Sequence, residues 1–261
     1  MDGSELRRAA DAFGARVEAL KQELRPGDFD WYPYNSLSNF QHLEALLTPR
    51  RHDLFEYVGS NPVLDVGAAD GETAFFLESL GLRVHVLEYG PTNYNGGRGL
   101  RMLHDALGST VDVSELDLDS QFELPGDRFG LALALGVLYH LKNPYFFLEQ
   151  LARRVAHMLV STRVARFNTA AGNTRAASGR QNAIRVDLST IPAAYLVDPY
   201  ETNNDPTNYW IFSVAGLRRI LARTGWEIIE FMTVGATDSD PATDTGDERA
   251  FCLLHSSVFQ D

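Results

Sequence analysis

The sequence predicts a doubly wound α/β domain, in which helices cover both faces of a largely parallel sheet. Strand-like and helix-like segments alternate after Asn61-Pro62, and a glycine-rich turn separates the first such pair. The run from Phe129 to Val137 is apolar throughout, as expected for a strand buried on both faces of a parallel sheet. This alternation implies right-handed βαβ units. The 261 residues suffice for one such domain with an N-terminal helical extension.

Residues 1–60 form the predicted extension and an aromatic lid. Apolar periodicity predicts a helix over Ser4–Leu24, which Pro26 and its neighbouring glycine end. An aromatic, turn-rich segment follows over residues 29–40. A second helix is predicted over Asn39–Val58, with Pro49 as a candidate break point.

Residues 61–261 form the predicted main domain. Residues 163–210 lose periodicity and are too long for a plain loop, so we expect a substrate-cap insertion there. A final hairpin is expected to close the sheet with an antiparallel strand. The other predicted elements are strands at Pro62–Val66, Arg83–Glu88, Thr110–Val113 and His157–Thr162, helices at Glu72–Leu80, from Asn143-Pro144 and at Ser213–Thr224, and hairpin strands at Trp226–Val234 and Ala250–Val258.

The composition describes a soluble, acidic chain. Lys and Arg total 23 against 35 Asp and Glu, a net charge of −12, which disfavours nucleic acid as a partner without excluding it. No apolar run approaches membrane-spanning length and the N-terminus lacks a signal-peptide core, so a cytoplasmic location without membrane contact is expected. The single cysteine excludes an intrachain disulfide and any multi-cysteine metal site. The oligomeric state stays open.

The most informative segment is the turn after the first strand. Gly67 and Gly71 bracket the small residues Ala68 and Ala69, which lets the backbone approach a ligand closely. A nicotinamide-binding turn would require glycine at positions 69 and 72, and Glu72 would place a carboxylate where a pyrophosphate should bind. The turn therefore favours a cofactor without phosphate that carries an amino-acid tail.

Acidic residues follow the next two strands at the same edge of the sheet. Glu88 ends the second strand, where an acid commonly binds the ribose hydroxyls of a nucleoside. Asp117 follows the third strand and is placed to accept a hydrogen bond from an adenine amino group, with Leu116 or Leu118 covering the ring. Tyr89 is a candidate for stacking on adenine, with ordinary strand-end packing as the alternative.

These residues resemble the class I S-adenosylmethionine-dependent methyltransferase family, which has a Rossmann-like sheet. The resemblance implies that Asp65 and the glycine turn hold the methionine part of the cofactor. It implies that Glu88 holds the ribose and Asp117 the adenine. The family usually has glycine where this chain has Ala69.

A second resemblance rests on the segment from Leu135 to Pro144, which reads Leu-Gly-Val-Leu-Tyr-His-Leu-Lys-Asn-Pro. It is similar to a segment of the enzymes that transfer a methyl or carboxymethyl group to wobble 5-hydroxyuridine in tRNA. Trp31 and Tyr32 resemble the tryptophan-rich segment of the same enzymes. Residues 29–47 contain no Lys or Arg to bind a carboxylated cofactor, so ordinary S-adenosylmethionine is expected.

Tyr139 and His140 follow the fourth strand at the edge where substrate should bind. Tyr139 is a candidate contact for cofactor or substrate, and His140 is a candidate general base. The alternative for His140 is a structural histidine bonded to a neighbouring loop. Trp31 and Tyr32 either close over the cofactor as a lid or fix the N-terminal helices to the sheet.

Two charged clusters are expected to be mainly solvent-exposed. The last hairpin loop holds acids, and we expect a solvated loop away from the site instead of a cation site. The insertion holds arginines, which form a solvated face or bind a small acidic ligand in preference to RNA. The acids are Asp238, Asp240, Asp244, Asp247 and Glu248, and the arginines are Arg163, Arg166, Arg175, Arg180 and Arg185.

The sequence thus predicts a methyltransferase that acts on oxygen or nitrogen of a small molecule. A tRNA wobble 5-hydroxyuridine methyltransferase is the main alternative. A non-catalytic module that uses the cofactor pocket for sensing or scaffolding is the third hypothesis.

Overall fold

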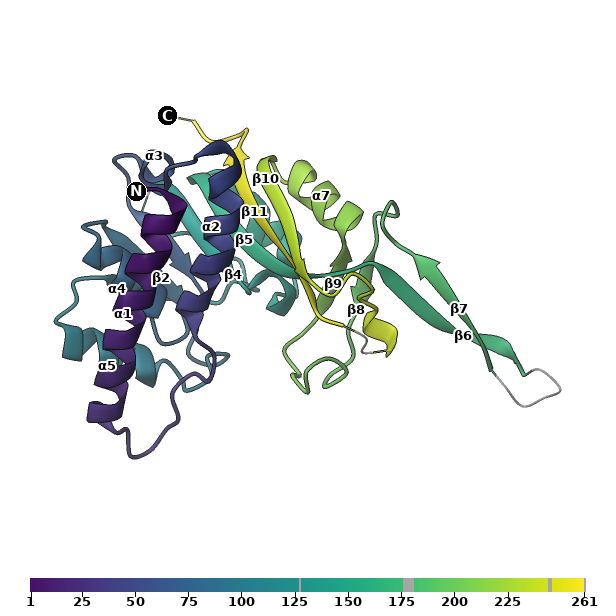
Figure 1. The fold of residues 1–261 in the computed structure, drawn as a ribbon, viewed down its shortest axis with the longest axis horizontal. Helices are drawn as coiled ribbons and strands as arrows, with labels where there is room; N and C mark the ends of the chain where they lie inside the picture. Colours follow the sequence, from purple (N-terminus) through teal and green to yellow (C-terminus); the bar gives the residue numbers. More distant parts are fainter. Residues whose placement is uncertain (127, 176–180, 244–245, 261) are drawn as a thin grey trace.

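The computed structural model describes residues 1–126, 128–175, 181–243 and 246–260. Its main sheet has the strand order β10-β11-β5-β4-β1-β2-β3 (Figure 1). The strands are β1 (Val63–Val66), β2 (Val84–Glu88), β3 (Asp112–Glu115), β4 (Phe129–Leu135), β5 (Val155–Ala165), β10 (Trp226–Gly235) and β11 (Glu248–Ser256).

The strand pairing confirms the predicted doubly wound sheet. Strands β1 to β5 pair in parallel, whereas β11 is antiparallel to both β5 and β10. Parallel strands place their carboxyl ends along one edge, and the strand order reverses at β1, with β2 and β3 on one side of it and β4 and β5 on the other. Ligands bind in the crevice outside this edge of such sheets.

Helices cover both faces of the sheet. One core cluster joins α1, α2, α4 and α5 to one face, and a second joins α6 and α7 to the other. Strand β4 lies between them, and its residues 129–134 are buried, as its continuous apolar run predicts. The helices are α1 (Gly3–Leu24), α2 (Asn39–Leu47), α3 (Leu54–Val58), α4 (Glu72–Ser79), α5 (Arg98–Leu107), α6 (Pro144–Ala152) and α7 (Val214–Arg223).

The N-terminal extension differs from its prediction in its second helix. Helix α2 ends at Leu47, a short 3₁₀ turn spans Thr48–Arg50, and α3 begins only at Leu54. Pro49 lies in the 3₁₀ turn, and Arg51 adopts φ 55° directly after it. The proline breaks the helix because it has no N–H to donate. The predicted helix over Asn39–Val58 is therefore two helices.

The insertion is more regular than predicted. Strand β5 continues to Ala165, and β6 (Phe167–Arg175) and β7 (Gln181–Asp187) form an antiparallel ribbon that extends from the body in Figure 1. Strands β8 (Ala194–Leu196) and β9 (Trp210–Ser213) pair with each other, and β9 pairs with β5. A two-stranded ribbon buries little side-chain area, so polar residues occupy it without the apolar alternation that marks a strand.

The other elements lie close to their predicted places. The third strand begins at Asp112 and not at Thr110, at the exposed edge of the sheet. The closing hairpin of β10 and β11 is antiparallel as predicted. Among the described residues, no helix combines the length and the apolarity needed to cross a membrane.

Candidate active site

The glycine turn joins β1 to α4 at the carboxyl edge of the sheet. Gly67 has φ 66°, and a Cβ atom there would lie 2.7 Å from Cγ2 of Val137 in the loop after β4. Gly71 has φ 84° and is closely packed against Leu100 and Phe75. Ala69 also has a positive φ, 55°, which costs an alanine more than a glycine. This left-handed backbone accounts physically for the glycine expected at position 69.

Glu88 lies directly beside this turn. Its Oε2 accepts a hydrogen bond from the Ala69 N–H at 2.8 Å, and its Oε1 accepts one from the Tyr89 N–H at 2.9 Å. Burial raises the pKa of this carboxyl, and the two backbone hydrogen bonds oppose the rise. The Asn93 side chain also hydrogen-bonds to this carboxylate. A carboxylate has about four lone-pair sites, so Glu88 can still accept a bond from a ligand hydroxyl.

Asp65 is a buried acid beneath the turn, with 4% of its surface exposed. The Ala74 N–H in the first turn of α4 bonds to it, while Oδ2 has no partner among the described residues. Burial raises its pKa to about 7, and the charge of Glu88 adds to the rise. A buried carboxylate oxygen without a partner is costly, and a cationic amino group would satisfy it. Asp65 therefore fits the methionine end of S-adenosylmethionine.

The residues predicted around adenine lie at the same edge. Asp117 Oδ1 accepts a hydrogen bond from the Asp119 N–H at 2.9 Å, and Asp117 Oδ2 takes no part in this bond. Asp119 in turn accepts from the backbone N–H of Lys142 at 2.7 Å and so ties the loop after β3 to the start of α6. Leu118 is buried, and Tyr89 and Leu135 are half-buried at the ends of β2 and β4.

A buried ionic cluster, which the sequence did not indicate, lies on the other side of the turn. Lys21 of α1 is 7% exposed, and its Nζ lies 3.2 Å from Asp70 Oδ2 and 2.5 Å from Glu72 Oε1. Asp70 also accepts from the Tyr32 N–H at 2.8 Å and from Asn95 Nδ2 at 2.8 Å. The carboxylate of Glu72, which argued against a pyrophosphate, is thus paired with a lysine. One acid fixes the helical extension, the aromatic segment and the loop before α5 to the glycine turn.

The aromatic segment divides into two parts with different surroundings. Trp31 packs against the core and lies under Lys21, whose Nζ is 5.1 Å from the ring centroid. The ring of Tyr32 contacts Tyr34 and Tyr94, and burial raises its pKa to about 12, with Tyr139 adding to the rise. The position of Trp31 is therefore that of a residue that fixes the N-terminal helices to the core. Tyr32 faces the residues after β4, which include Tyr139.

Tyr139 lies in the short 3₁₀ turn η3 (Leu138–His140) after β4 and is 7% exposed. Burial raises the pKa of its hydroxyl, while Arg249 hydrogen-bonds to it and opposes the rise. Arg249 pairs in register with Arg163 across β11 and β5, and Asp247 lies within 3.6 Å of the first and 3.2 Å of the second. Arg249 was not predicted at the site, and Arg163 was predicted only as a member of the arginine cluster in the insertion.

His140 stacks against Tyr139, with ring centroids 4.1 Å apart. Its Nδ1 lies 3.1 Å from the carbonyl oxygen and 2.9 Å from Oγ1 of Thr207 in the insertion. Burial lowers the pKa of the imidazole, and the bond to Thr207 and the charge of Asp205 oppose this. The loop contact expected of a structural histidine is present, but it uses only one of the two ring nitrogens.

The two charged clusters pair with each other, and the prediction that both are solvated is wrong for their buried members only. Asp238, Asp247 and Arg185 are exposed as predicted. Asp240 and Glu248 are each 2% exposed, and Arg163 is 5% exposed. Arg166 binds Glu248 at 2.7 Å, while Arg185 donates to the backbone oxygen of Asp238 at 3.0 Å. These contacts hold the start of the insertion against the loop before β11. Asp244 and Arg180 lie outside the described residues, as does the side chain of Arg175.

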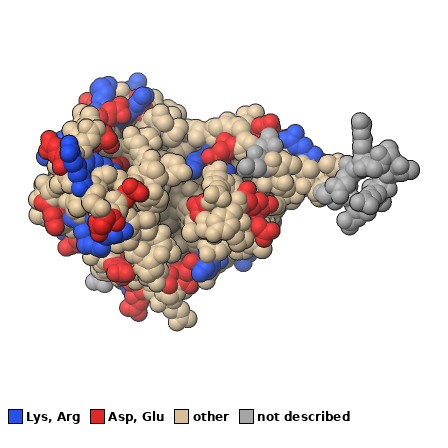
Figure 2. Space-filling view, turned by 90° about the horizontal axis from the view of Figure 1, so that it is seen from below, with Lys and Arg blue, Asp and Glu red and all other residues tan. Residues whose placement is uncertain are grey.

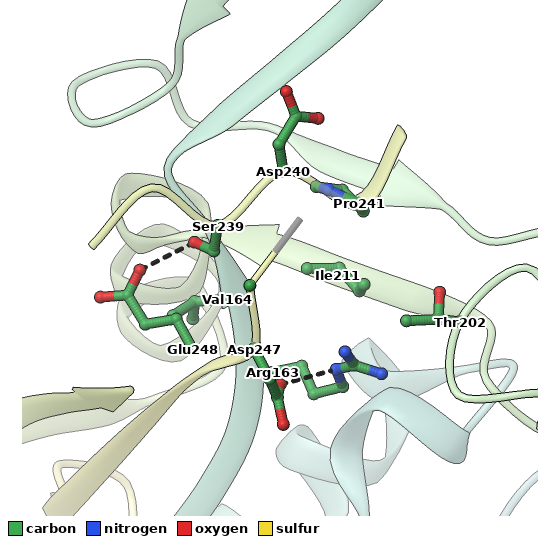
Figure 3. Close-up of a pocket in the computed structure, with 10 residues that line it drawn as sticks. Arg163, Val164, Thr202, Ile211, Ser239, Asp240, Pro241, Asp247 and Glu248 are labelled. Carbon is green, nitrogen blue, oxygen red and sulfur yellow. Dashed lines mark hydrogen bonds and ion pairs between the residues drawn. The ribbon is translucent and has the colours of Figure 1, made fainter. Parts of the chain in front are cut away.

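Figure 3 shows a small cavity between the insertion and the loop before β11. The Arg163 side chain points from β5 toward Thr202 while its Nε bonds Asp247. The space measures about 10 Å³, the size of one water molecule. It also adjoins two atoms without partners in the described chain, Arg163 Nη1 and Thr202 Oγ1. The cavity is suited to a bound water and is too small for a substrate.

The comparisons with known proteins agree with this geometry. The methyltransferase domain family matches residues 36–231, and the chain belongs to that family. The predicted class is confirmed: the protein is an S-adenosylmethionine-dependent methyltransferase with the class I fold. No curated protein sequence matches the chain.

Solved structures share the fold at low sequence identity. The N-terminal domain of EvdMO1 with SAH bound is 18% identical, with a TM-score of 0.54 over 98% of this chain and 97% of that one. An S-adenosylmethionine-dependent methyltransferase from Mesorhizobium loti is 17% identical, with a TM-score of 0.52 over 84% and 97% of the two chains. The glycopeptide N-methyltransferase MtfA complexed with SAH is 14% identical, with a TM-score of 0.50 over 92% and 97%.

Proposed function

We propose that this methyltransferase transfers a methyl group to an oxygen or nitrogen of a small molecule. In this proposal Asp65 and the turn from Gly67 to Gly71 hold the methionine part of the cofactor, Glu88 the ribose, and Asp117 the adenine. S-adenosylmethionine supplies a methyl group already activated by its sulfonium. Residues 1–60 act as extension and lid, residues 61–261 as the catalytic domain, and residues 163–210 as the substrate cap.

The observation that carries the proposal is the position of His140 between Tyr139 and the cap, at the carboxyl edge of the sheet. The acceptor's lone pair forms the bond to the methyl carbon, and the carbon–sulfur bond breaks with its electron pair left on sulfur. The acceptor's proton passes to Nε2 of His140, which has no hydrogen bond within the described chain. Burial keeps this imidazole neutral near pH 7 and therefore able to accept the proton.

The charge distribution supports a small acceptor over tRNA. The insertion arginines whose side chains are described lie near carboxylates, which offset much of the positive charge available to phosphates. Figure 2, seen from below, shows acidic and basic side chains interspersed on this face and no continuous basic surface in view. One protein of similar fold is a glycopeptide N-methyltransferase, which is compatible with a nitrogen acceptor.

Calorimetry and a methyl-transfer screen test the proposal. S-adenosylmethionine and its demethylated product should bind the wild type, and should bind the Glu88→Ala variant at least tenfold more weakly. The control variant Glu123→Ala replaces an exposed glutamate and should bind both compounds as the wild type does. Labelled methyl transfer to a panel of phenols, sugars and amines is expected, with none to total tRNA. His140→Gln should lower kcat on the acceptor by about 10²- to 10⁴-fold. Transfer to tRNA alone, or full activity of His140→Gln, would contradict the proposal.

A further inference from the structure

The hydrogen bonds of His140 determine which of its ring nitrogens carries the proton. The carbonyl oxygen of Thr207, 3.1 Å from Nδ1, can only accept a hydrogen bond. The neutral imidazole has one N–H, so this contact requires that N–H to be on Nδ1. The other nitrogen, Nε2, then carries a free lone pair.

The side chain of Thr207 leads independently to the same assignment. Its hydroxyl donates its only proton to Asp205 Oδ1 at 2.6 Å, because a carboxylate can only accept. The hydroxyl oxygen, 2.9 Å from Nδ1, must then accept from His140. Asp205 Oδ1 also accepts from the Thr207 N–H at 2.8 Å, which fixes the carboxylate in this position.

We propose that Thr207 and Asp205 are positioning residues, which hold His140 in the Nδ1–H tautomer so that Nε2 is the basic atom of the active site. The inference rests on the proposed function, because it concerns how the proposed base is prepared. When Nε2 takes the acceptor's proton, both ring nitrogens carry hydrogen, and the Nδ1–H bond to Thr207 is retained. The imidazolium then returns its proton to solvent.

The charges around His140 explain why a carboxylate is needed at this place. Arg249 on β11 and Arg163 on β5 both disfavour the protonated imidazole, and Tyr139 packs against its face. Asp205 is the acid that acts in the opposite direction. Through the Thr207 hydroxyl, its charge stabilises the imidazolium that proton transfer forms.

Backbone contacts fix the part of the cap that carries these residues. The Tyr209 N–H donates to the carbonyl oxygen of Tyr139 at 2.9 Å. Asn208 is 3% exposed, and its side-chain Nδ2 donates to the backbone oxygen of Thr202 at 3.0 Å. The base is therefore assembled from two separate segments, η3 and the cap loop.

Nitrogen-15 NMR of the histidine rings tests the inference on the protein alone, with His140→Gln to assign the signal among seven histidines. In the wild type near pH 7, we expect Nδ1 to be protonated and Nε2 to be bare. Thr207→Val removes the hydroxyl acceptor but keeps the carbonyl acceptor of the Nδ1–H, so it should shift the population in part, and measurably, toward the Nε2–H tautomer. Asp205→Asn, which can still accept the hydroxyl bond, should keep the tautomer but lower the measured pKa of His140, because it removes the negative charge that favours the imidazolium.

Asp198→Asn is the matched control, since it replaces an exposed cap carboxylate that makes no contact with His140. A wild-type signal from Nε2–H, or variants that match this control, would overturn the inference. On an acceptor from the screen, Thr207→Val should lower kcat about tenfold with little change in KM. If His140→Gln abolishes turnover while Thr207→Val and Asp205→Asn do not affect it, the positioning role is wrong and the proposed function stands. If His140→Gln keeps full activity, the proposed function itself fails.

Discussion

The buried cation of Lys21 gives the sharpest prediction about stability. Replacing Lys21 with Met keeps most of the apolar stem but removes the charge between Asp70 and Glu72. Both acids are buried, with 1% and 8% of their surfaces exposed. The variant therefore tests how much the folded state depends on one charge and not on one side-chain volume.

The structure assigns most of the cost to Glu72. Asp70 keeps its bonds from the Tyr32 N–H and from Asn95 after the substitution, whereas Lys21 is the only hydrogen-bond partner described for the Glu72 carboxylate. Removing one member of a buried ion pair costs about 3–5 kcal/mol, because it leaves an uncompensated charge. For a chain of this size, that loss lowers Tm by about 10 °C.

Thermal and urea denaturation measure this loss directly. Lys142→Met is the matched control, since Lys142 is the other lysine of the chain and is exposed, and it should change the unfolding free energy by less than about 0.5 kcal/mol. Adding Glu72→Gln to Lys21→Met should recover part of the loss. The reasoning is refuted if Lys21→Met is as stable as the control, or if Glu72→Gln makes it still less stable.

Two further predictions concern the glycine turn and the acid beneath it. Ala69→Gly should raise the unfolding free energy by about 0.5 kcal/mol, because φ 55° strains alanine. Gly67→Ala should lower it by about 1–3 kcal/mol, because of φ 66° and the contact with Val137. Urea denaturation that ranks the two variants in the reverse order would contradict this. The folded-state pKa of Asp65 is about 7, above its unfolded value of about 3.9, so without cofactor this residue favours the folded state at low pH and loses that contribution as the pH rises from about 4 to 7. Asp65→Asn should remove this part of the pH dependence, and cofactor binding to the wild type near pH 7 should release a proton, which calorimetry in two buffers detects; identical pH profiles for wild type and variant would rule it out.

Local patterns in the sequence were enough to predict most of the fold. A few consecutive residues are enough to recognise the buried strand β4 and the turn after β1. The apolar run of β4 indicates burial on both faces, and the glycines of the turn indicate a backbone with positive φ. The ribbon of β6 and β7 could not be predicted in the same way. It packs against little else, so no apolar period marks it.

The site was predictable only in part, for the same physical reason. Asp65, Glu88 and Asp117 could be predicted to lie near one another because each lies at or near the carboxyl end of a strand, and parallel strands end at one edge. The pairing of Arg163 with Asp247, 84 positions apart in the numbering, carries no such signal. Ion pairs between distant segments depend on the register of β5 and β11, which only the folded sheet sets.

The sequence by itself indicated the class of protein, since the glycine turn and the acids at or just after the carboxyl ends of the first three strands favour a nucleoside cofactor without a pyrophosphate and resemble one methyltransferase family. Only the tertiary structure decided which other groups act with them. Lys21 reaches Asp70 and Glu72 across about 50 residues, and Thr207 reaches His140 across 67. These contacts form because α1 and the cap pack onto the sheet. The periodicity of apolar residues predicts helices and strands, but it does not predict which side chains touch when they are that far apart in the sequence.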